Sequence, residues 1–175
     1  MSEQNIEKEQ LYKGVFRAEK KDGTVYYRAS LTKNGKHISL GSFPDALQAH
    51  RAYEQGLLLL SDPSLTLQSY EKVSPLSFEK WVSLINLRDN GLYIGNPIYL
   101  GQQLFYYYLS PHHVLKFDME DLFYYSSHKI MCRGNHYFVA ATRLDHSLMV
   151  SLTASFKVMV PEVTGCTLAP RSSIR

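Results

Sequence analysis

Residues 25–43, VYYRASLTKNGKHISLGSF, contain two alternating segments on either side of an Asn-Gly pair. In the first segment Tyr27, Ala29 and Leu31 point one way and the residues between them point the other, because successive side chains of a strand alternate. Asn34-Gly35 favours the positive φ angles of a tight hairpin turn. The stretch is therefore predicted to form two antiparallel strands with one apolar and one polar face.

The residues on both sides of this hairpin are predicted to extend it to a sheet packed on a helix. Residues 12–18 form a further predicted strand, which ends in the glycine-containing turn at 19–23. Pro44 and Asp45 are helix start signals. The apolar stripe predicted for the helix comprises Ala46, Ala49, Ala52, Tyr53 and Leu57. We expect an α+β fold that begins with a three-stranded antiparallel sheet, one face of which the helix covers.

Basic residues are concentrated in the same part of the chain. Between residues 12 and 41, seven Lys and Arg residues stand against two acidic ones, a local net charge of +5, whereas the whole chain carries only +3. The basic residues are Lys13, Arg17, Lys20, Lys21, Arg28, Lys33 and Lys36. A local basic face of this kind suits the neutralisation of phosphates. An open, polar sheet face can enter the major groove of DNA.

Four segments in this region resemble the plant ethylene-response-factor (Apetala-type) DNA-binding domain. They are YKGV at 12–15, YRASL at 27–31, GKHISLGSF at 35–43 and AHRAY at 49–53, in the order and spacing of that family's motifs. The resemblance covers residues 11–60 and implies that basic strands dock in the major groove of double-stranded DNA. Similar domains occur in bacterial and phage proteins beside HNH homing endonucleases.

The resemblance also implies which positions contact DNA. Lys13 stands at the position of an Arg that contacts a phosphate or a base in the family. On the second strand, Ser30 stands where the family has a Glu and Thr32 where it has an Arg; on the third strand, His37 stands at an Arg and Ser39 at a Trp. Tyr53 stands at the helix Tyr that reaches a phosphate. Because several base-reading residues of the family are replaced by small or neutral ones, the plant target site is not predicted. Arg17, Arg28, Lys33 and Lys36 are expected to restore affinity through phosphates. The alternative is a basic but inert surface whose lysines are simply solvated.

A polar connection over residues 61–75 is predicted to separate this domain from a second, aromatic-rich α+β module over 76–140. The expected elements are a helix that begins near Ser77 and ends at Asn90-Gly91, extended segments over 92–94, 97–100, 104–109 and 136–140, and a segment over 117–125 that is ambiguous between strand and helix. Residues 1–10 are predicted to be disordered. Residues 141–175, where tyrosine disappears, are expected to form an atypical, truncated or frameshifted tail.

Two aromatic triplets invite a nucleic-acid interpretation. Tyr106-Tyr107-Tyr108 and Phe123-Tyr124-Tyr125 could hold unpaired bases by stacking. Core packing is the favoured interpretation, since alternating aromatic residues of a strand usually bury one ring and leave its neighbour partly wet.

The histidines raise the alternative of a metal-dependent nuclease. They are His112, His113, His128, His136 and His146, and Cys132 stands at helical i, i+4 spacing from His128. No established ligand pattern such as H-E-x-x-H is present, so no metal, cofactor or catalytic residue is predicted. Residues 76–140 show a weaker resemblance to a clostridial module that is paired with an HNH-like end, and nothing after Ala140 matches the N-G-D element expected there.

The favoured interpretation is a non-enzymatic bacterial DNA-binding protein, either transcription-factor-like or a targeting module of a mobile element. The alternatives are an HNH-type homing endonuclease or its inactive remnant, and a protein-interaction module with incidental DNA affinity. No segment has the features of a signal peptide or a membrane span, so we expect no membrane partner and a cytoplasmic, nucleoid-associated location. Cys132 and Cys166 have no partner motif and are expected to be reduced thiols.

Overall fold

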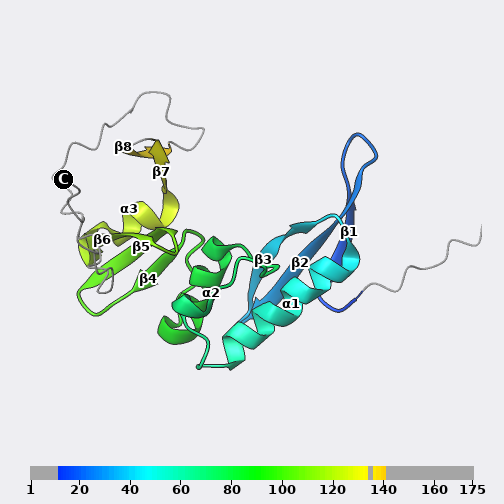
Figure 1. Ribbon diagram of the computed structural model, residues 1–175, viewed down its shortest axis with the longest axis horizontal. Helices are drawn as coiled ribbons and strands as arrows, with labels where there is room; N and C mark the ends of the chain where they lie inside the picture. Colours follow the sequence, from blue (N-terminus) through cyan, green and yellow to red (C-terminus); the bar gives the residue numbers. More distant parts are fainter. Residues whose placement is uncertain (1–11, 134–135, 141–175) are drawn as a thin grey trace, which may run out of the picture.

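The computed structural model describes residues 12–133 and 136–140 (Figure 1). The predictions for residues 1–10 and 141–175, including those for His146 and Cys166, lie outside the described residues. The described chain has the predicted α+β architecture, with an N-terminal three-stranded antiparallel sheet, helices and two further small sheets. None of the described helices is both long and apolar enough to cross a membrane.

The N-terminal sheet contains β1 (Val15–Glu19), β2 (Val25–Lys33) and β3 (Lys36–Phe43), which are hydrogen-bonded in that order. Both pairings are antiparallel and join strands that are consecutive in the chain, as the hairpin signals predict. The β2–β3 hairpin turns at Asn34 and Gly35, whose φ angles are 51° and 72°. These positive angles confirm the tight turn that the Asn-Gly pair favours.

A bulge in β3 lets one more leucine reach the core. Ala29 pairs with Gly41 and Ser30 pairs with Ser39, so Leu40 has no partner on β2. Gly41 adopts a φ of 142°, a conformation that residues with a side chain rarely adopt. The extra residue leaves Leu40 buried while Ser39 stays exposed, as the alternation predicts.

Helix α1 (Ala46–Ser61) lies across one face of this sheet (Figure 1). The carboxylate of Asp45 caps it by accepting hydrogen bonds from two backbone amides of the first turn. The buried residues of the helix are Ala49, Ala52, Tyr53, Gly56 and Leu59. The predicted stripe is wrong at Leu57, which is 42% exposed. The buried stripe follows positions i, i+3, i+4, i+7 and i+10 from Ala49, and Leu57 falls one residue beyond i+7.

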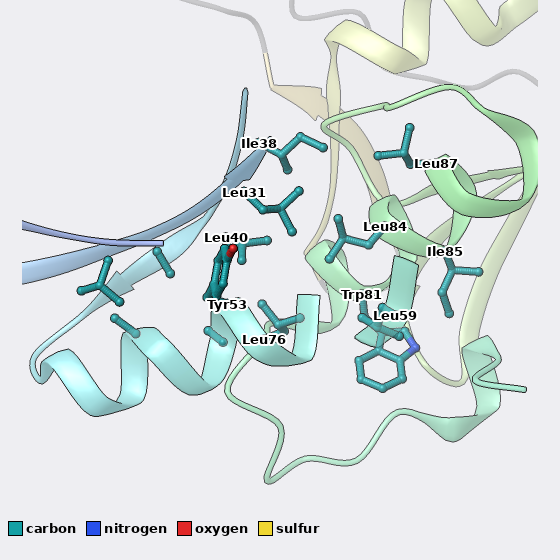
Figure 2. Packing of buried hydrophobic residues seen from close by; sticks show 14 residues of the cluster. Leu31, Ile38, Leu40, Tyr53, Leu59, Leu76, Trp81, Leu84, Ile85 and Leu87 are labelled. Atoms are coloured by element: carbon teal, nitrogen blue, oxygen red, sulfur yellow. The ribbon is translucent and has the colours of Figure 1, made fainter. Parts of the chain in front are cut away.

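The core of the N-terminal sheet continues past residues 61–75 into α2 (Phe78–Asn90) (Figure 2). Residues of the sheet and of both helices belong to one hydrophobic cluster, which includes Leu31, Ile38, Leu40, Leu59, Leu76, Trp81, Leu84, Ile85 and Leu87. The domain boundary at 61–75 stays a prediction, and the hydrophobic core does not divide there. It divides after α2, where a second cluster begins at Ile94.

Hydrogen bonds hold the predicted linker against this core. Arg88 Nη1 donates to three backbone carbonyl oxygens, at 3.2 Å to Leu59, 2.6 Å to Asp62 and 2.8 Å to Leu65. Trp81 Nε1 donates to the carbonyl oxygen of Thr66 at 3.0 Å. A short 3₁₀ helix, η1 (Leu67–Ser69), follows immediately. A composition rich in Ser, Asp and Pro thus indicates a loop here, and hydrogen bonds from the side chains of α2 hold this loop in place.

The second sheet contains β4 (Ile98–Leu100), β5 (Leu104–Ser110) and β6 (His113–Asp118), again antiparallel and in chain order. The first two strands confirm the predictions for 97–100 and 104–109. The segment that was ambiguous over 117–125 completes β6 and then forms η2 (Met119–Asp121) and α3 (Leu122–Ser127).

A two-stranded sheet ends the described chain, formed by β7 (Lys129–Arg133) and β8 (His136–Ala140). The strand predicted at 136–140 is confirmed. His128 caps α3 and Cys132 lies in β7, so these two residues do not share a helix despite their i, i+4 spacing.

The second hydrophobic cluster lies on one face of the second sheet and buries one tyrosine of the first aromatic triplet. Tyr107 is buried beside Phe105, and its hydroxyl accepts a hydrogen bond of 3.0 Å from the backbone amide of Ile130. Tyr106 and Tyr108 point to the other face and are partly exposed. The expectation of one buried ring between partly wet neighbours is confirmed for this triplet. In the second triplet Tyr125 is buried, whereas Phe123 is 89% exposed, so core packing is wrong for Phe123.

Candidate nucleic-acid interface

The face of the N-terminal sheet that lies opposite α1 is the first candidate surface. Val15, Ala29 and Leu31 point into the core on the α1 side, so the residues that alternate with them point to the other side. We call this other side the open face. Its side chains are those of Phe16, Ala18, Tyr26, Arg28, Ser30, Thr32, His37, Ser39 and Ser42, and most of these residues are exposed.

Strand register places three exposed side chains in a row across the middle of the open face. Phe16 of β1 pairs with Arg28 of β2, and Arg28 pairs with Ser42 of β3. Cross-strand neighbours on one face of a sheet lie about 5 Å apart. The row therefore presents an aromatic ring, a guanidinium and a hydroxyl side by side.

Arg28 is held in place by its neighbour on the same strand face. Its Nη2 donates a hydrogen bond of 2.7 Å to the hydroxyl of Tyr26, and its Cζ lies 5.4 Å from the centroid of that ring. Both contacts restrict the rotamers of a side chain that is otherwise exposed. Less conformational entropy is then lost when the guanidinium binds a ligand.

Phe16 is the large apolar side chain of this row, and 54% of it is exposed. A single exposed aromatic ring is unremarkable on a protein surface. Here the ring stands directly beside a fixed guanidinium on a flat sheet face, a combination that suits a planar, polar partner better than water.

Basic side chains lie at both ends of the sheet rather than across its open face. Lys20 and Lys21 belong to the β1–β2 turn, and Lys33 and Lys36 flank the β2–β3 turn. These two turns lie at opposite ends of β2, whose nine residues span about 30 Å. The charge predicted for the face is therefore distributed around its ends.

Three of the four basic residues that were expected to contact phosphates have side chains that point to the α1 side of the sheet. Arg17 pairs with Tyr27, which packs on the core, and Lys33 follows the open-face residue Thr32 and so points the other way. The ammonium of Lys36 lies 5.0 Å from the ring centroid of Tyr93. Among these four residues, Arg28 alone lies on the open face.

The residues at family positions divide in the same way. Thr32 and His37 form an exposed cross-strand pair on the open face, where Ser39 is also exposed. Ser30 faces the same side but is only 7% exposed, because it lies at the β3 bulge.

Two further predicted positions lie outside the open face. Lys13 precedes β1 with an exposed side chain, and its carbonyl oxygen accepts a 3.3 Å hydrogen bond from His50 Nδ1. Tyr53 is only 9% exposed, and its ring covers Gly14, where a Cβ would lie 2.1 Å from Tyr53 Cδ2. The ring of Tyr53 thus packs in the core, and its phosphate contact stays a prediction from the resemblance.

Phe16, Tyr26 and Ser42 belong to the candidate interface although they were not predicted site residues. Their face is set by register, which a single sequence gives only through the two hairpin turns. The alternation that places Arg28 outward also places Tyr26 outward, and pairing across either hairpin leads to Phe16 and Ser42. That signal was available in the sequence.

The histidines of the second half form separate local contacts. His113 Nε2 shares a hydrogen bond of 2.6 Å with the hydroxyl of Tyr137. His128 stacks on Tyr124 with ring centroids 4.3 Å apart, and its Nδ1 donates to the carbonyl oxygen of the same residue. Within residues 12–133 and 136–140, no group of three or more His, Cys, Asp or Glu side chains could hold a metal ion.

Comparison with known proteins gives no relative from which a role could be transferred. No protein-family model matches the chain, and no curated protein or solved structure matches it. The resemblance to the Apetala-type domain stays a prediction from the sequence, and the interface rests on the geometry of the open face.

Proposed function

We propose that the protein binds double-stranded DNA through the open face of its N-terminal sheet. The observation that carries the proposal is the exposed row of Phe16, Arg28 and Ser42. Tyr26, next to this row, accepts a hydrogen bond from the Arg28 guanidinium and holds it in place. The major groove, about 12 Å wide, admits a flat ribbon of strands. A sheet with one free face can enter it without unfolding any described element.

The three side chains of the row have distinct roles in this proposal. Arg28 donates to the O6 and N7 acceptors of a guanine, which is the commonest specific contact in the major groove. Phe16 contacts a thymine methyl group, and Ser42 donates to or accepts from a neighbouring base edge. In this proposal the side chains of the row read the base edges directly. The family positions that carry small residues here do not.

The basic turns supply affinity that does not depend on sequence. With the row in the groove, Lys20 and Lys21 of the β1–β2 turn reach the phosphates beside that end of the sheet. Lysine contacts of this kind position the protein and release counterions. Binding should therefore weaken strongly with salt, and Lys20→Ala plus Lys21→Ala should reduce the slope of log affinity against log salt by about 2.

The test measures fluorescence anisotropy of a labelled duplex with the full chain. Arg28→Ala should weaken binding by about 10- to 100-fold, because a bidentate guanine contact contributes about 1–3 kcal/mol. Arg51→Ala is the matched control: Arg51 is an exposed arginine on α1, the helix that covers the opposite face of the sheet. This control should retain wild-type affinity.

Equal losses for the two arginine variants would overturn the proposed interface, because they would show that only total charge matters. Absence of binding by the wild-type chain at low salt would overturn DNA binding itself. The inert, solvated surface is then the remaining interpretation. A nucleoid-associated location follows from the proposal and depends on the same measurements.

A further inference from the structure

A pocket of about 380 Å³ lies on the second sheet, far along the chain from the open face. Its walls come from β4 and β5, from the C-terminal end of α2 and from the loop that includes η1. Residues that line the pocket include Ile85, Arg88, Asp89, Tyr99, Tyr106 and Tyr108. The volume lies within the usual range for small-molecule sites and suits one small ligand rather than a helix or strand of a partner.

Three tyrosines make one wall of this pocket aromatic. Tyr99 of β4 pairs directly with Tyr106 of β5, and Tyr108 lies two residues further along the same strand, so all three share one face. The rings are partly exposed, whereas Tyr107 between them points into the core. One wall of the pocket is therefore aromatic, and Tyr108 also makes an edge contact with Phe78 at a centroid distance of 6.0 Å.

Polar groups converge on the same space. Within the described part of the chain, the hydroxyls of Tyr106 and Tyr108 have no hydrogen-bond partner, and Tyr99 donates to Asp89 Oδ2 at 3.2 Å. Burial, together with the nearby Tyr106 and Tyr99, raises the pKa of Tyr108 above its ordinary value. These hydroxyls are neutral donors and acceptors that a bound ligand can use.

The charges that line the pocket are already balanced. Arg88 Nη1 is occupied by three carbonyl oxygens, and its Nε and Nη2 donate to the two carboxylate oxygens of Asp89. The guanidinium has little capacity left for an anion. Asp89 Oδ1 accepts only from Arg88 Nε in the described structure, so it retains a lone pair for a donor of the ligand. A planar, uncharged ring with an amine donor fits this part of the pocket.

One exposed cation stands just outside the aromatic wall. Lys116 of β6 pairs with Tyr106, and its Nζ lies 5.9 Å from the centroid of the Tyr106 ring. A phosphate attached to a ligand that stacks on Tyr106 would lie within reach of this ammonium. The surface thus combines an aromatic site for a base with a nearby cation for a phosphate, which is the arrangement that single-stranded nucleic-acid sites use.

We propose that this pocket binds the nucleobase of a nucleotide. The base stacks on Tyr106 and Tyr108, its exocyclic amine donates a hydrogen bond to Asp89, and the phosphate of the nucleotide lies beside Lys116. The base can come from a free nucleotide or from an unpaired nucleotide of a nucleic acid, because both present the same groups. The site shares no residue with the open face, so it stands or falls independently of duplex binding.

The first experiment measures binding of adenosine and of adenosine monophosphate to the full chain by equilibrium dialysis. Tyr106→Leu should weaken both ligands by about 10-fold or more, since stacking on an aromatic ring dominates the affinity for a base. Tyr106→Phe, which keeps the ring, should change affinity by less than about 3-fold. Lys116→Ala should weaken the nucleotide and leave the nucleoside unchanged.

The second experiment separates the two sources of the base. A short oligo-deoxyadenylate is titrated into a chain that carries Arg28→Ala, which removes the main contact proposed for the open face. Binding of the mononucleotide identifies a free nucleotide as a ligand. Binding of the oligonucleotide alone, lost in Tyr106→Leu, identifies an unpaired base of a nucleic acid, and either result supports the proposal.

A tyrosine outside the pocket provides the control. Tyr124 is an exposed residue of α3, and Tyr124→Leu should leave all affinities unchanged. No saturable binding of nucleoside, nucleotide or oligonucleotide up to millimolar concentration would overturn the proposal. Equal losses in Tyr124→Leu and Tyr106→Leu, with unchanged thermal unfolding of both variants, would overturn it as well.

Discussion

The two three-stranded sheets of this protein share a topology but differ in how their faces are covered. Both are antiparallel with strands in chain order, and each packs against a helix. The N-terminal sheet packs on α1 and leaves its other face open (Figure 1). The second sheet buries Phe105 and Tyr107 on one side, and on the other it faces the end of α2 across the tyrosine pocket.

This difference in covering decides what each sheet can bind. A sheet with one free face presents a flat surface about as long as its strands, which matches an extended groove. A sheet that is covered on both faces can bind a ligand only where the covering elements leave a gap. Such a gap is a small concavity that holds a single small group. The same local topology thus leads to a flat open surface in one half and to a small pocket in the other, and the two binding proposals rest on this difference.

The largest predicted effect contrasts one phenylalanine from each sheet. Phe105 is 0% exposed and stacks on Phe117 at a centroid distance of 5.2 Å, so Phe105→Ala should lower the free energy of unfolding by about 3–5 kcal/mol. Phe16 stands on the open face, and Phe16→Ala should change stability by less than about 0.5 kcal/mol while it weakens duplex binding. Urea denaturation of the full chain measures both changes. A large loss of stability in Phe16→Ala would mean that the open face is covered in solution.

A second prediction concerns how closely the N-terminal sheet lies on α1. Gly14 has a φ of 77°, and a Cβ there would lie 2.1 Å from the Tyr53 ring, so Gly14→Ala should cost about 2–4 kcal/mol from backbone strain and overpacking together. Gly35 is the matched control, with a φ of 72° and no atom within 4 Å of the added Cβ. Gly35→Ala should cost only about 1 kcal/mol. Equal costs would show that Tyr53 does not close over Gly14.

The third prediction concerns the attachment of the second sheet to α2. Asn86 is buried, its Oδ1 accepts from the backbone amide of Leu100 at 2.9 Å, and its Nδ2 donates to the carbonyl oxygen of Leu92 at 2.7 Å. Asn86→Ala leaves both backbone groups without a partner and should cost about 1–3 kcal/mol in urea denaturation. Gln103, exposed in the β4–β5 turn, provides the control, and Gln103→Ala should be neutral. A neutral Asn86→Ala would show that water replaces the side chain there.

Much of the N-terminal sheet could be predicted because its signals are local. The alternation around Ala29 and Leu31 and the Asn34-Gly35 turn fix two strands and their faces without knowledge of the rest of the chain. The second half has weaker signals. Strand β6 follows a Pro111-His112 turn without glycine, and β7 begins directly after the residue that caps α3, so neither shows a hairpin signature. The shared core with α2 depends on long-range contacts that composition does not report.

The candidate interface was predictable only in part, for a related reason. Arg28 follows from strand alternation, whereas the exclusion of Lys36 depends on Tyr93, which lies far away in sequence. Tyr53 occupies a family position, but its burial depends on the close approach of Gly14. The stacking interpretation of Tyr106 and Tyr108 was available from the sequence, but the pocket was not, because its walls come from segments that only the tertiary fold brings together.

The smallest predicted effect is a pH response confined to one turn of the N-terminal sheet. The Asp22 carboxylate accepts a hydrogen bond of 2.9 Å from the Thr24 amide, and this bond lowers the pKa of Asp22 below its ordinary value. Because the folded pKa lies below the unfolded one, the stabilisation is present above roughly pH 4 and is lost as the pH falls through the folded pKa. The β2–β3 turn at Asn34 and Gly35 contains no carboxylate, so it should not respond.

Amide hydrogen exchange between about pH 5 and pH 3, corrected for the intrinsic pH dependence of exchange, measures this response turn by turn. Protection of Thr24 should fall with acid, whereas protection in β5, at the centre of the second sheet, should stay constant. Asp22→Asn should remove the acid response of Thr24 and leave that of Ser64, whose amide donates to Asp62, a residue with a similarly lowered pKa. A parallel loss in β5 would show that acid acts on the whole fold, and the two sheets would then have to be treated as one cooperative unit.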